Sequence, residues 1–370
     1  MIPRLEIQQF IDEEFIEPAG SETIHILDPM TKTPLVETVA ASKPDVDKAV
    51  SAARNAFDTG PWPRLHVWER AAALLRLSDA IERNAEDLTL LEAIDTGKPI
   101  AGVRSWDIPH AAEVYRYYAG WADKITGEVL PSSGNVSIVT RREPVGICAA
   151  IIPWNFPFAC VAWKIAPALA VGCTVVVKPS ERAPLSAQFL AKLIQDAEFP
   201  PGVVNVVLGK GPIAGAALVT DPRIDKITFT GDIHTAQSIV RTSASHLPRL
   251  TLELGGKNPN VVLDDADLDA AVAGTVDAMF SVQGQNCCAG SRTFVHQPVF
   301  DEFMAKLVLA AEQRRLGDPL NDHTEQGPRS IAAIWSGSTP MSRRRSLPAV
   351  SASPGVDRRR QVAYSTPPPF

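Results

Sequence analysis

The sequence predicts an α/β fold, and three observations carry that prediction. From about residue 146 onward, short β-rich runs alternate with stretches long enough to form a helix. The runs are almost continuously apolar, which is typical of parallel strands covered on both faces. The chain has 370 residues, more than one ordinary core accommodates, so we expect at least two domains. The predicted strands are residues 147–152, 174–177, 203–207, 226–229 and 260–263.

The first part of the chain has a different pattern. Residues 1–40 are loop-like with short strands, whereas residues 45–57 and 67–84 place apolar side chains at helical spacing. Asp45 stands where an acidic side chain would cap the first of these helices. Parallel α/β sheets bind nucleotides beyond the carboxyl ends of their strands, so we expect the chemistry at those ends.

Composition excludes several classes of protein. The net charge of −6 gives no electrostatic reason to bind nucleic acid or an anionic membrane. No apolar run approaches the roughly 20 residues of a membrane span, and the first residues lack a signal-peptide core. Five cysteines without framework spacing fit reduced thiols. We therefore expect a cytoplasmic protein without nucleic-acid or membrane partners.

The composition changes again near the end of the chain. Residues 329–370 hold seven Arg, no Lys, eight Ser, six Pro and a single acidic residue, Asp357. No helix or strand periodicity persists there. This composition predicts disorder.

The segment from Gly284 to Arg292 contains two adjacent cysteines, Cys287 and Cys288, just after the helical pattern of residues 267–280. A thiolate between small and polar residues could add to a carbonyl carbon. A lone cysteine is more often buried and inert, so this motif alone does not establish that Cys287 or Cys288 is a nucleophile. Adjacent cysteines make a poor zinc site because structural zinc needs spaced ligands, and we expect no metal.

A carboxylate on an apolar segment marks the second motif. Glu253 lies between Leu252 and Leu254 and is followed by two glycines. If this segment is buried, burial disfavours the charged carboxylate and suits it to general-base work. A glutamate that points to solvent at a strand end is the alternative.

Two further motifs follow predicted strands. Asn155, in a Pro-Trp-Asn-Phe-Pro segment, could donate a hydrogen bond to a developing oxyanion, although Asn and Pro are also ordinary turn residues. Lys178 and Glu181 could hold the hydroxyls of an adenosine ribose, or they could form a surface pair. Glycines at 209, 211, 215 and 231 would let the backbone approach a phosphate, but glycine spacing alone is weak evidence.

Taken together and in this order, these motifs resemble the NAD(P)-dependent aldehyde dehydrogenase superfamily over residues 24–328. The matching segments are Pro144–Gly146, Pro153–Pro157, Lys178–Glu181, Phe229–Gly231, Glu253–Lys257 and Gly284–Cys287. The resemblance implies a Rossmann-like cofactor domain, an incomplete α/β catalytic domain and part of a bridging oligomerisation sheet. The corresponding ranges are 1–120 with 141–253 for the NAD-binding domain, 121–140 for the oligomerisation hairpin, 254–328 for the partial catalytic domain and 329–370 for a tail outside the family.

The resemblance also implies residue roles. Cys287 resembles the nucleophile that forms a thiohemiacetal and then a thioester, and Asn155 with the backbone N–H of Cys287 resembles the oxyanion hole. Glu253 resembles the base that activates water. Cys288 is the neighbour rather than the nucleophile. The NAD-contacting positions implied in this way are Ile152, Pro153, Trp154, Lys178, Ser180, Glu181, Gly211, Gly215, Phe229, Gly231, Asp232 and Leu254.

Three departures from the family pattern stand out. Asp232 replaces a serine after Phe-Thr-Gly, and Ala236 replaces a glycine. A carboxylate that faced the pyrophosphate would repel it. The family's later Glu-x-Phe-Gly-Pro motif is absent, so we expect a truncated chain, with a tail from a shifted reading frame or an alternative terminus.

The function implied is oxidation of a small-molecule aldehyde to a carboxylic acid with NAD and water, in a family whose members are homo-oligomers. One alternative is CoA-acylating oxidation of a semialdehyde, which does not need the water-activating Glu253. The other alternative is an inactive remnant that at most binds the cofactor.

Overall fold

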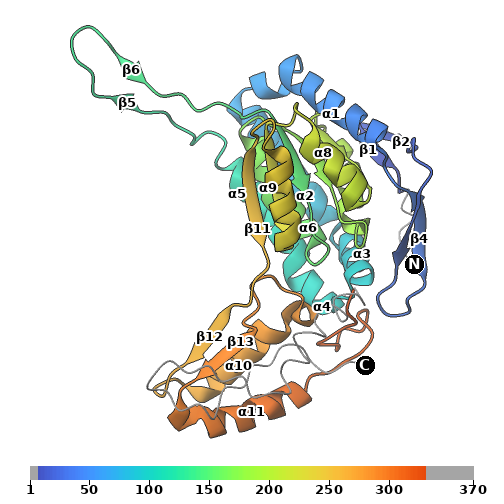
Figure 1. Ribbon diagram of the computed structural model, residues 1–370, viewed down its shortest axis with the longest axis vertical. Coiled ribbons are helices and arrows are strands. Elements are labelled where there is room, and N and C mark those ends of the chain that lie inside the picture. The colour runs from blue at the N-terminus through green and yellow to red at the C-terminus, as the bar shows by residue number, and fades with distance from the viewer. Residues whose placement is uncertain (1–6, 331–370) are drawn as a thin grey trace.

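The structure is a computed structural model that describes residues 7–330, and it forms a larger and a smaller body joined after β11 (Figure 1). The larger body is built on a seven-stranded sheet. Its strand order is β11 (Arg249–Leu254), β10 (Lys226–Gly231), β7 (Ile147–Ile151), β8 (Thr174–Lys178), β9 (Val204–Val206), β1 (Gln9–Ile11) and β2 (Glu14–Ile16). The α/β class and four of the predicted strands are thereby confirmed.

Strand direction shows where this sheet can bind a ligand. The five strands from β11 to β9 run parallel, whereas β1 and β2 add antiparallel strands at one edge. The chain passes from β7 to β8 and β9 on one side and then returns to β10 and β11 on the other. The strand order therefore reverses between β7 and β10, and such a reversal opens a crevice at the carboxyl ends of the two strands.

Helices cover both faces of the sheet, which explains the apolar runs. In β7, Cys148 and Ala150 face one core, while Ile147, Ala149 and Ile151 face the other. The first core is covered by α2 (Val67–Arg83), α3 (Ala85–Thr96), α5 (Ile108–Ala119), α6 (Pro157–Ala170) and α7 (Leu185–Asp196). The second core is covered by α1 (Lys43–Asp58), α8 (Ala216–Thr220) and α9 (Ile233–Ser243). Short helical turns connect these elements at α4 (Ile100–Gly102), η1 (Trp62–Arg64), η2 (Val103–Asp107) and η3 (Gly211–Gly215).

The expectation that Asp45 caps the first helix needs a correction. The cap of α1 is Ser42, and Asp45 lies three residues later as the partner in a capping box. The Asp45 carboxylate accepts hydrogen bonds from the Ser42 N–H and hydroxyl. Burial acts to raise the pKa of Asp45, but the Ser42 hydroxyl and backbone hydrogen bonds outweigh it and hold the pKa below its usual range.

The smaller body contains the fifth predicted strand. Residues 259–262 form β12 (Pro259–Val262), which pairs in parallel with β13 (Arg292–Val295) rather than joining the seven-stranded sheet. Its core lies between the β12–β13 pair and two helices, α10 (Leu268–Phe280) and α11 (Phe300–Glu312). The turn η4 (Ser281–Gly284) and a loop lead from α10 to β13, and η5 (Gln297–Val299) precedes α11.

Two hairpins complete the described chain. One pairs β3 (Thr23–Leu27) with β4 (Pro34–Val39), and the other pairs β5 (Val129–Leu130) with β6 (Ile138–Val139). The β5–β6 hairpin projects away from the larger body (Figure 1). Among the described helices, none is long and apolar enough to cross a bilayer. Of the tail predicted to be disordered, residues 331–370 lie outside the described residues.

Candidate functional site

The loop after β7 lies at the crevice where the strand order reverses. The Ile152 N–H continues the ladder to the Lys178 carbonyl at 2.9 Å, and Phe156 then caps α6 with Pro157 in its first turn. Proline fits the first helical turn because the amide hydrogen it lacks would have no intrahelical partner there. Ile152, Pro153 and Phe156 are buried, whereas Asn155 is only partly buried. The loop is thus firmly held, with the Asn155 side chain near its surface.

Asn155 connects this loop to the smaller body. Its Nδ2 donates a hydrogen bond to the Gln285 carbonyl at 2.8 Å, across 130 residues of sequence. Gln285 precedes Cys287 by two positions. An amide nitrogen carries two N–H donors, so this contact uses one and leaves a second for another acceptor. The structure therefore places Asn155 and the Cys287 loop side by side.

The Cys287 thiol is exposed, as is that of Cys288. The Asn258 side chain donates to the Cys287 carbonyl at 3.1 Å, which fixes the backbone of the loop. The Cys288 thiol donates to Asn286 Oδ1 at 3.1 Å, and the Cys287 thiol lies 3.7 Å from the same oxygen. Partial burial, followed by the neighbouring Cys288, raises the pKa of Cys287 above its usual value. A proton acceptor must therefore help to form the thiolate.

Glu253 lies in β11, in register with Thr230 of the neighbouring strand. Its side chain is exposed, so of the two alternatives left open by the sequence, the glutamate that points to solvent is the one observed. The reason is that β11 is the edge strand of the sheet, with a paired neighbour on one side only. Glu253 is accordingly open to water in this part of the molecule.

Lys164 is a residue that the sequence pattern did not single out. It lies in the second turn of α6, is buried, and donates to Thr228 Oγ1 at 3.1 Å. Burial lowers the pKa of Lys164 to about 8, although electrostatic attraction to Cys160 and Glu253 opposes that shift. Cys160 in turn interacts electrostatically with Cys287. The first two turns of α6 therefore link the surroundings of Cys287 to those of Glu253, with a lysine that can exchange a proton near neutral pH.

Lys178 and Glu181 lie at the carboxyl end of β8. Lys178 Nζ donates to the Pro179 carbonyl at 2.8 Å and lies 3.6 Å from Glu181 Oε2. Burial lowers the pKa of Lys178, and Glu181 opposes that shift. Gly215 lies against the aliphatic stem of Lys178, at ordinary contact distance for a Cβ built on the glycine. Ser180 is half-buried, and its hydroxyl accepts from the Arg182 N–H.

Four predicted cofactor residues, Phe229, Gly231, Asp232 and Leu254, lie around the ends of β10 and β11, whereas Gly211 begins η3 after β9 and Trp154 follows β7. A Cβ on Gly231 would meet the far end of the Phe229 ring at 2.4 Å, so a larger residue there would require the ring to shift. Asp232 caps α9 and accepts from both the Thr235 N–H and hydroxyl. Burial acts to raise the pKa of Asp232, but these hydrogen bonds outweigh it and the pKa is lowered. The Asp232 carboxylate is therefore engaged as the cap of α9, a role that a serine also fills.

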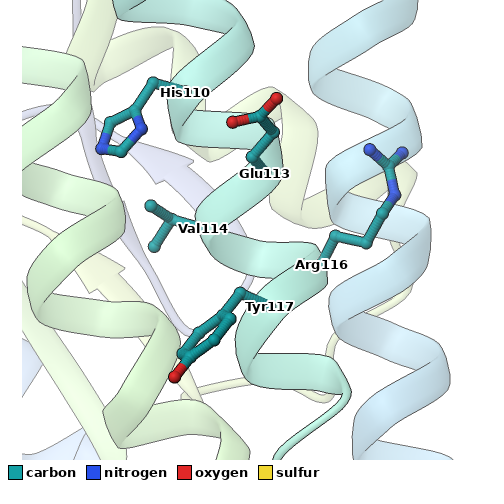
Figure 2. A pocket seen from close by; sticks show the side chains of 5 residues that line it. All are labelled: His110, Glu113, Val114, Arg116 and Tyr117. Atoms are coloured by element: carbon teal, nitrogen blue, oxygen red, sulfur yellow. The ribbon is translucent and has the colours of Figure 1, made fainter.

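Aromatic side chains extend from the Asn155 loop along α5. Phe156 packs against Trp106 and Trp163 at ring-centre distances of 5.6 and 6.3 Å. Trp163 Nε1 donates to His110 Nε2 at 2.8 Å, and His110 stacks on Trp106. Beyond His110 the surface is hollowed along α5 (Figure 2). None of the predicted catalytic or cofactor residues lines that depression, which is formed by His110, Glu113, Val114, Arg116 and Tyr117.

Comparison with known proteins decides the family. Residues 15–333 match the sequence profile of the family described as "Aldehyde dehydrogenase family". The chain belongs to the aldehyde dehydrogenase family. The resemblance drawn from the motifs is thereby confirmed.

Individual relatives agree with this assignment. The chain is 47% identical over 322 residues to "Aldehyde dehydrogenase family 2 member B4, mitochondrial" from Arabidopsis thaliana, covering 87% of this chain and 60% of that protein. It is 47% identical over 323 residues to "Aldehyde dehydrogenase, mitochondrial" from Homo sapiens, covering 87% and 62%. The chain thus spans about 60% of the length of these curated relatives.

Solved structures give the same fold. An aldehyde dehydrogenase from Bacillus cereus, solved as an NAD+ complex, aligns with a TM-score of 0.91 at 42% identity, covering 98% of this chain and 74% of that one. A putative aldehyde dehydrogenase from Burkholderia cenocepacia aligns with a TM-score of 0.90 at 41% identity, covering 94% and 72%. The aldehyde dehydrogenase-like fold expected from the sequence is confirmed.

Proposed function

We propose that this chain carries the nucleophile, oxyanion donor and cofactor site of an NAD-dependent aldehyde dehydrogenase that forms a carboxylic acid. The observation that carries the proposal is the contact between Asn155 and the Cys287 loop. It brings an amide donor against the loop that carries an exposed thiol, at the edge of a crevice suited to a nucleotide.

The residues around the crevice fit NAD by their donor chemistry. The Lys178 ammonium donates and the Glu181 carboxylate accepts, 3.6 Å apart, which suits the adjacent hydroxyls of a ribose. Trp154 and Gly231 lie at the two strand ends where the sheet order reverses, and there we place the pyrophosphate. A Cβ on Gly211 would meet no atom within 4 Å, so that backbone is open to a ligand. When bound, NAD supplies the hydride acceptor for the oxidation.

Acylation would begin when a base removes the Cys287 proton and the thiolate adds to the aldehyde carbon. The carbonyl π pair moves to oxygen, giving a thiohemiacetal oxyanion. The second N–H of Asn155 and the backbone N–H of Cys287 would donate to that oxygen. Loss of hydride from the same carbon restores the carbonyl as a thioester of Cys287.

Deacylation would use Glu253 as the base. The carboxylate takes a proton from water while the water oxygen bonds to the thioester carbon. The carbon–sulfur bond then breaks, the acid departs, and Cys287 leaves as a thiolate. The solvent exposure of Glu253 supports this role because water reaches the carboxylate directly.

NADH formation from short aldehydes tests the proposal as a whole. Absorbance at the NADH band should rise on mixing the chain with NAD and aldehyde, and the product should be the free acid. Turnover that depends on added coenzyme A would instead favour the acylating semialdehyde reaction. Cofactor binding without any NADH would favour the inactive remnant.

Glu253→Gln is expected to uncouple the two halves of the reaction. Acylation precedes the step that Glu253 serves, so the variant should release a burst of NADH and then turn over slowly. Rapid-mixing absorbance measures both phases. A normal steady-state rate in the variant would remove Glu253 from the mechanism.

Glu181→Gln is expected to narrow a preference for NAD over NADP. A carboxylate accepts from the ribose 2′-hydroxyl but repels a 2′-phosphate, a difference on the order of 1–3 kcal/mol. Dissociation constants of both cofactors, measured by fluorescence titration, give the ratio before and after the change. Equal affinities in the unmodified chain would refute the assignment.

Three further expectations stay predictions. Residues 121–140 form the proposed oligomerisation hairpin, supported by exposed apolar side chains on β5 and β6 such as Val129, at 78% exposure. The body of the aldehyde would lie along Phe156, Trp106 and Trp163, because these rings extend from Asn155. Cytoplasmic location also stays a prediction, since several relatives are described as mitochondrial.

A further inference from the structure

The loop that carries Cys287 begins with two consecutive residues of left-handed backbone. Val282 has φ 52° and Gln283 has φ 56°, both within η4. Residues with a Cβ adopt this conformation only where the surrounding structure holds them in it. An anchor must therefore act on this turn, four residues before Cys287.

The Gln283 side chain supplies that anchor. It is 1% exposed, and its Nε2 donates to the carbonyls of Gly97 and Pro328. Among the residues that the structure describes, its Oε1 is buried without a hydrogen-bond partner. Burying an amide oxygen without a hydrogen-bond partner costs free energy. The two hydrogen bonds that the Gln283 Nε2 donates must therefore stabilise the fold by more than this cost.

The anchor point belongs to a fixed part of the larger body. Gly97 ends α3 in a left-handed conformation, and Lys98 follows it. Lys98 is buried in contact with the carboxylates of Glu92 and Asp107. Its ammonium lies 4.3 Å from the ring centre of Phe156, the residue after the oxyanion donor. The Gly97 turn is therefore tied to the same loop that carries Asn155.

Two anchors consequently hold the nucleophile loop against one framework. Gln283 donates to Gly97, and Asn155 donates to Gln285. We propose that Gln283 is a positioning residue, which fixes the Cys287 thiol relative to the Asn155 amide by tying the turn to Gly97. The proposal rests on the proposed function, in which these two groups act on one carbonyl.

The first test replaces the amide by a side chain of similar size. Gln283→Met removes both donated hydrogen bonds, and a displacement of about 1 Å at a reacting group lowers the rate by roughly 100-fold. We expect kcat for aldehyde oxidation to fall by about 10-fold to 100-fold, while the KM for NAD stays unchanged. Gln195→Met is the matched control, because the Gln195 amide also donates to a backbone carbonyl, that of Glu13, away from this loop.

A second readout does not depend on turnover. Iodoacetamide alkylation of Cys287, followed by peptide mass spectrometry, reports how the thiol is held. Releasing the loop should lessen the desolvation that raises the pKa of the Cys287 thiol and bring that pKa toward its usual value, so alkylation at fixed pH should become faster. Cys160 is 2% exposed and serves as an internal reporter, because it is alkylated quickly only if the fold opens.

Slower turnover with faster alkylation at Cys287, and no change at Cys160, supports the proposal. Unchanged kcat and unchanged alkylation in Gln283→Met would overturn it. If that variant does not fold, Gln283→Gly provides the test, since glycine accepts the left-handed backbone but cannot form the anchor. Full kcat in the glycine variant would assign the positioning to the backbone and overturn the role of the side chain.

Aldehyde oxidation that survives Cys287→Ala would instead overturn the proposed function, while the alkylation readout would still decide whether Gln283 holds the loop.

Discussion

Cys287→Ala is expected to abolish aldehyde oxidation, with a loss of at least about 1000-fold in kcat. No covalent adduct can form without the thiol, and removal of a nucleophile typically leaves only the weak catalysis from binding and oxyanion contacts. The geometry favours Cys287 because its carbonyl is held by Asn258 and its loop by Asn155. NADH formation at saturating NAD and aldehyde measures the loss.

Cys288→Ala is the matched control, since both thiols are exposed and both lie near Asn286 Oδ1. We expect most of the activity to remain in this variant. The loss of Cys288 removes a neighbouring group that raises the pKa of Cys287, so alkylation of Cys287 should also shift to slightly lower pH. Equal loss of activity in the two variants would refute the assignment of Cys287.

The parts of this fold that could be predicted from sequence are those set by local burial. Every residue of β7 and β8 is buried, so β7 is apolar throughout and β8 is apolar at its three central positions. A strand was also predicted at residues 260–263, where the structure has β12 at 259–262, but its place in a separate sheet was not, because pairing with β13 depends on a segment some 30 residues away. An apolar run predicts that a strand exists, but it does not predict which other strand pairs with it.

The parts of the candidate site that could be predicted are those formed by residues close together in the sequence. Lys178 and Glu181 were singled out from one short motif at the end of a strand, and their side chains lie 3.6 Å apart. For Glu253 the sequence left two alternatives, burial between Leu252 and Leu254 or exposure at a strand end, and the side chain is exposed on an edge strand. Exposure of that kind depends on which strands are neighbours in the sheet, and the local pattern does not contain this information.

Contacts over long sequence separations account for the rest. Lys164 lies within the apolar helix α6, where nothing in the pattern shows that it faces Thr228. Gln283 belongs to a polar segment in the sequence, but its partner Gly97 is 186 residues away. The residues that support the site could therefore not be identified from the sequence, whereas those expected to perform the chemistry could.

Asn155→Ala is expected to lower kcat by about 100-fold to 1000-fold, the usual effect of removing one oxyanion donor. The structural reason is that the Asn155 amide has two N–H groups, of which one holds the Gln285 carbonyl. The second can stabilise negative charge on the aldehyde oxygen, which develops only after the thiol has added. The KM for NAD should therefore change little.

Because Asn155 also supports the loop, its two roles must be separated. Alkylation of Cys287 by iodoacetamide displaces iodide and creates no oxyanion, so it responds to the placement and the pKa of the thiol and not to an oxyanion donor. If stabilisation of the oxyanion dominates, Asn155→Ala should slow aldehyde oxidation while leaving alkylation at Cys287 nearly unchanged. If alkylation changes as much as kcat does, the contact with Gln285 is the main contribution of Asn155, and its assignment as an oxyanion donor fails.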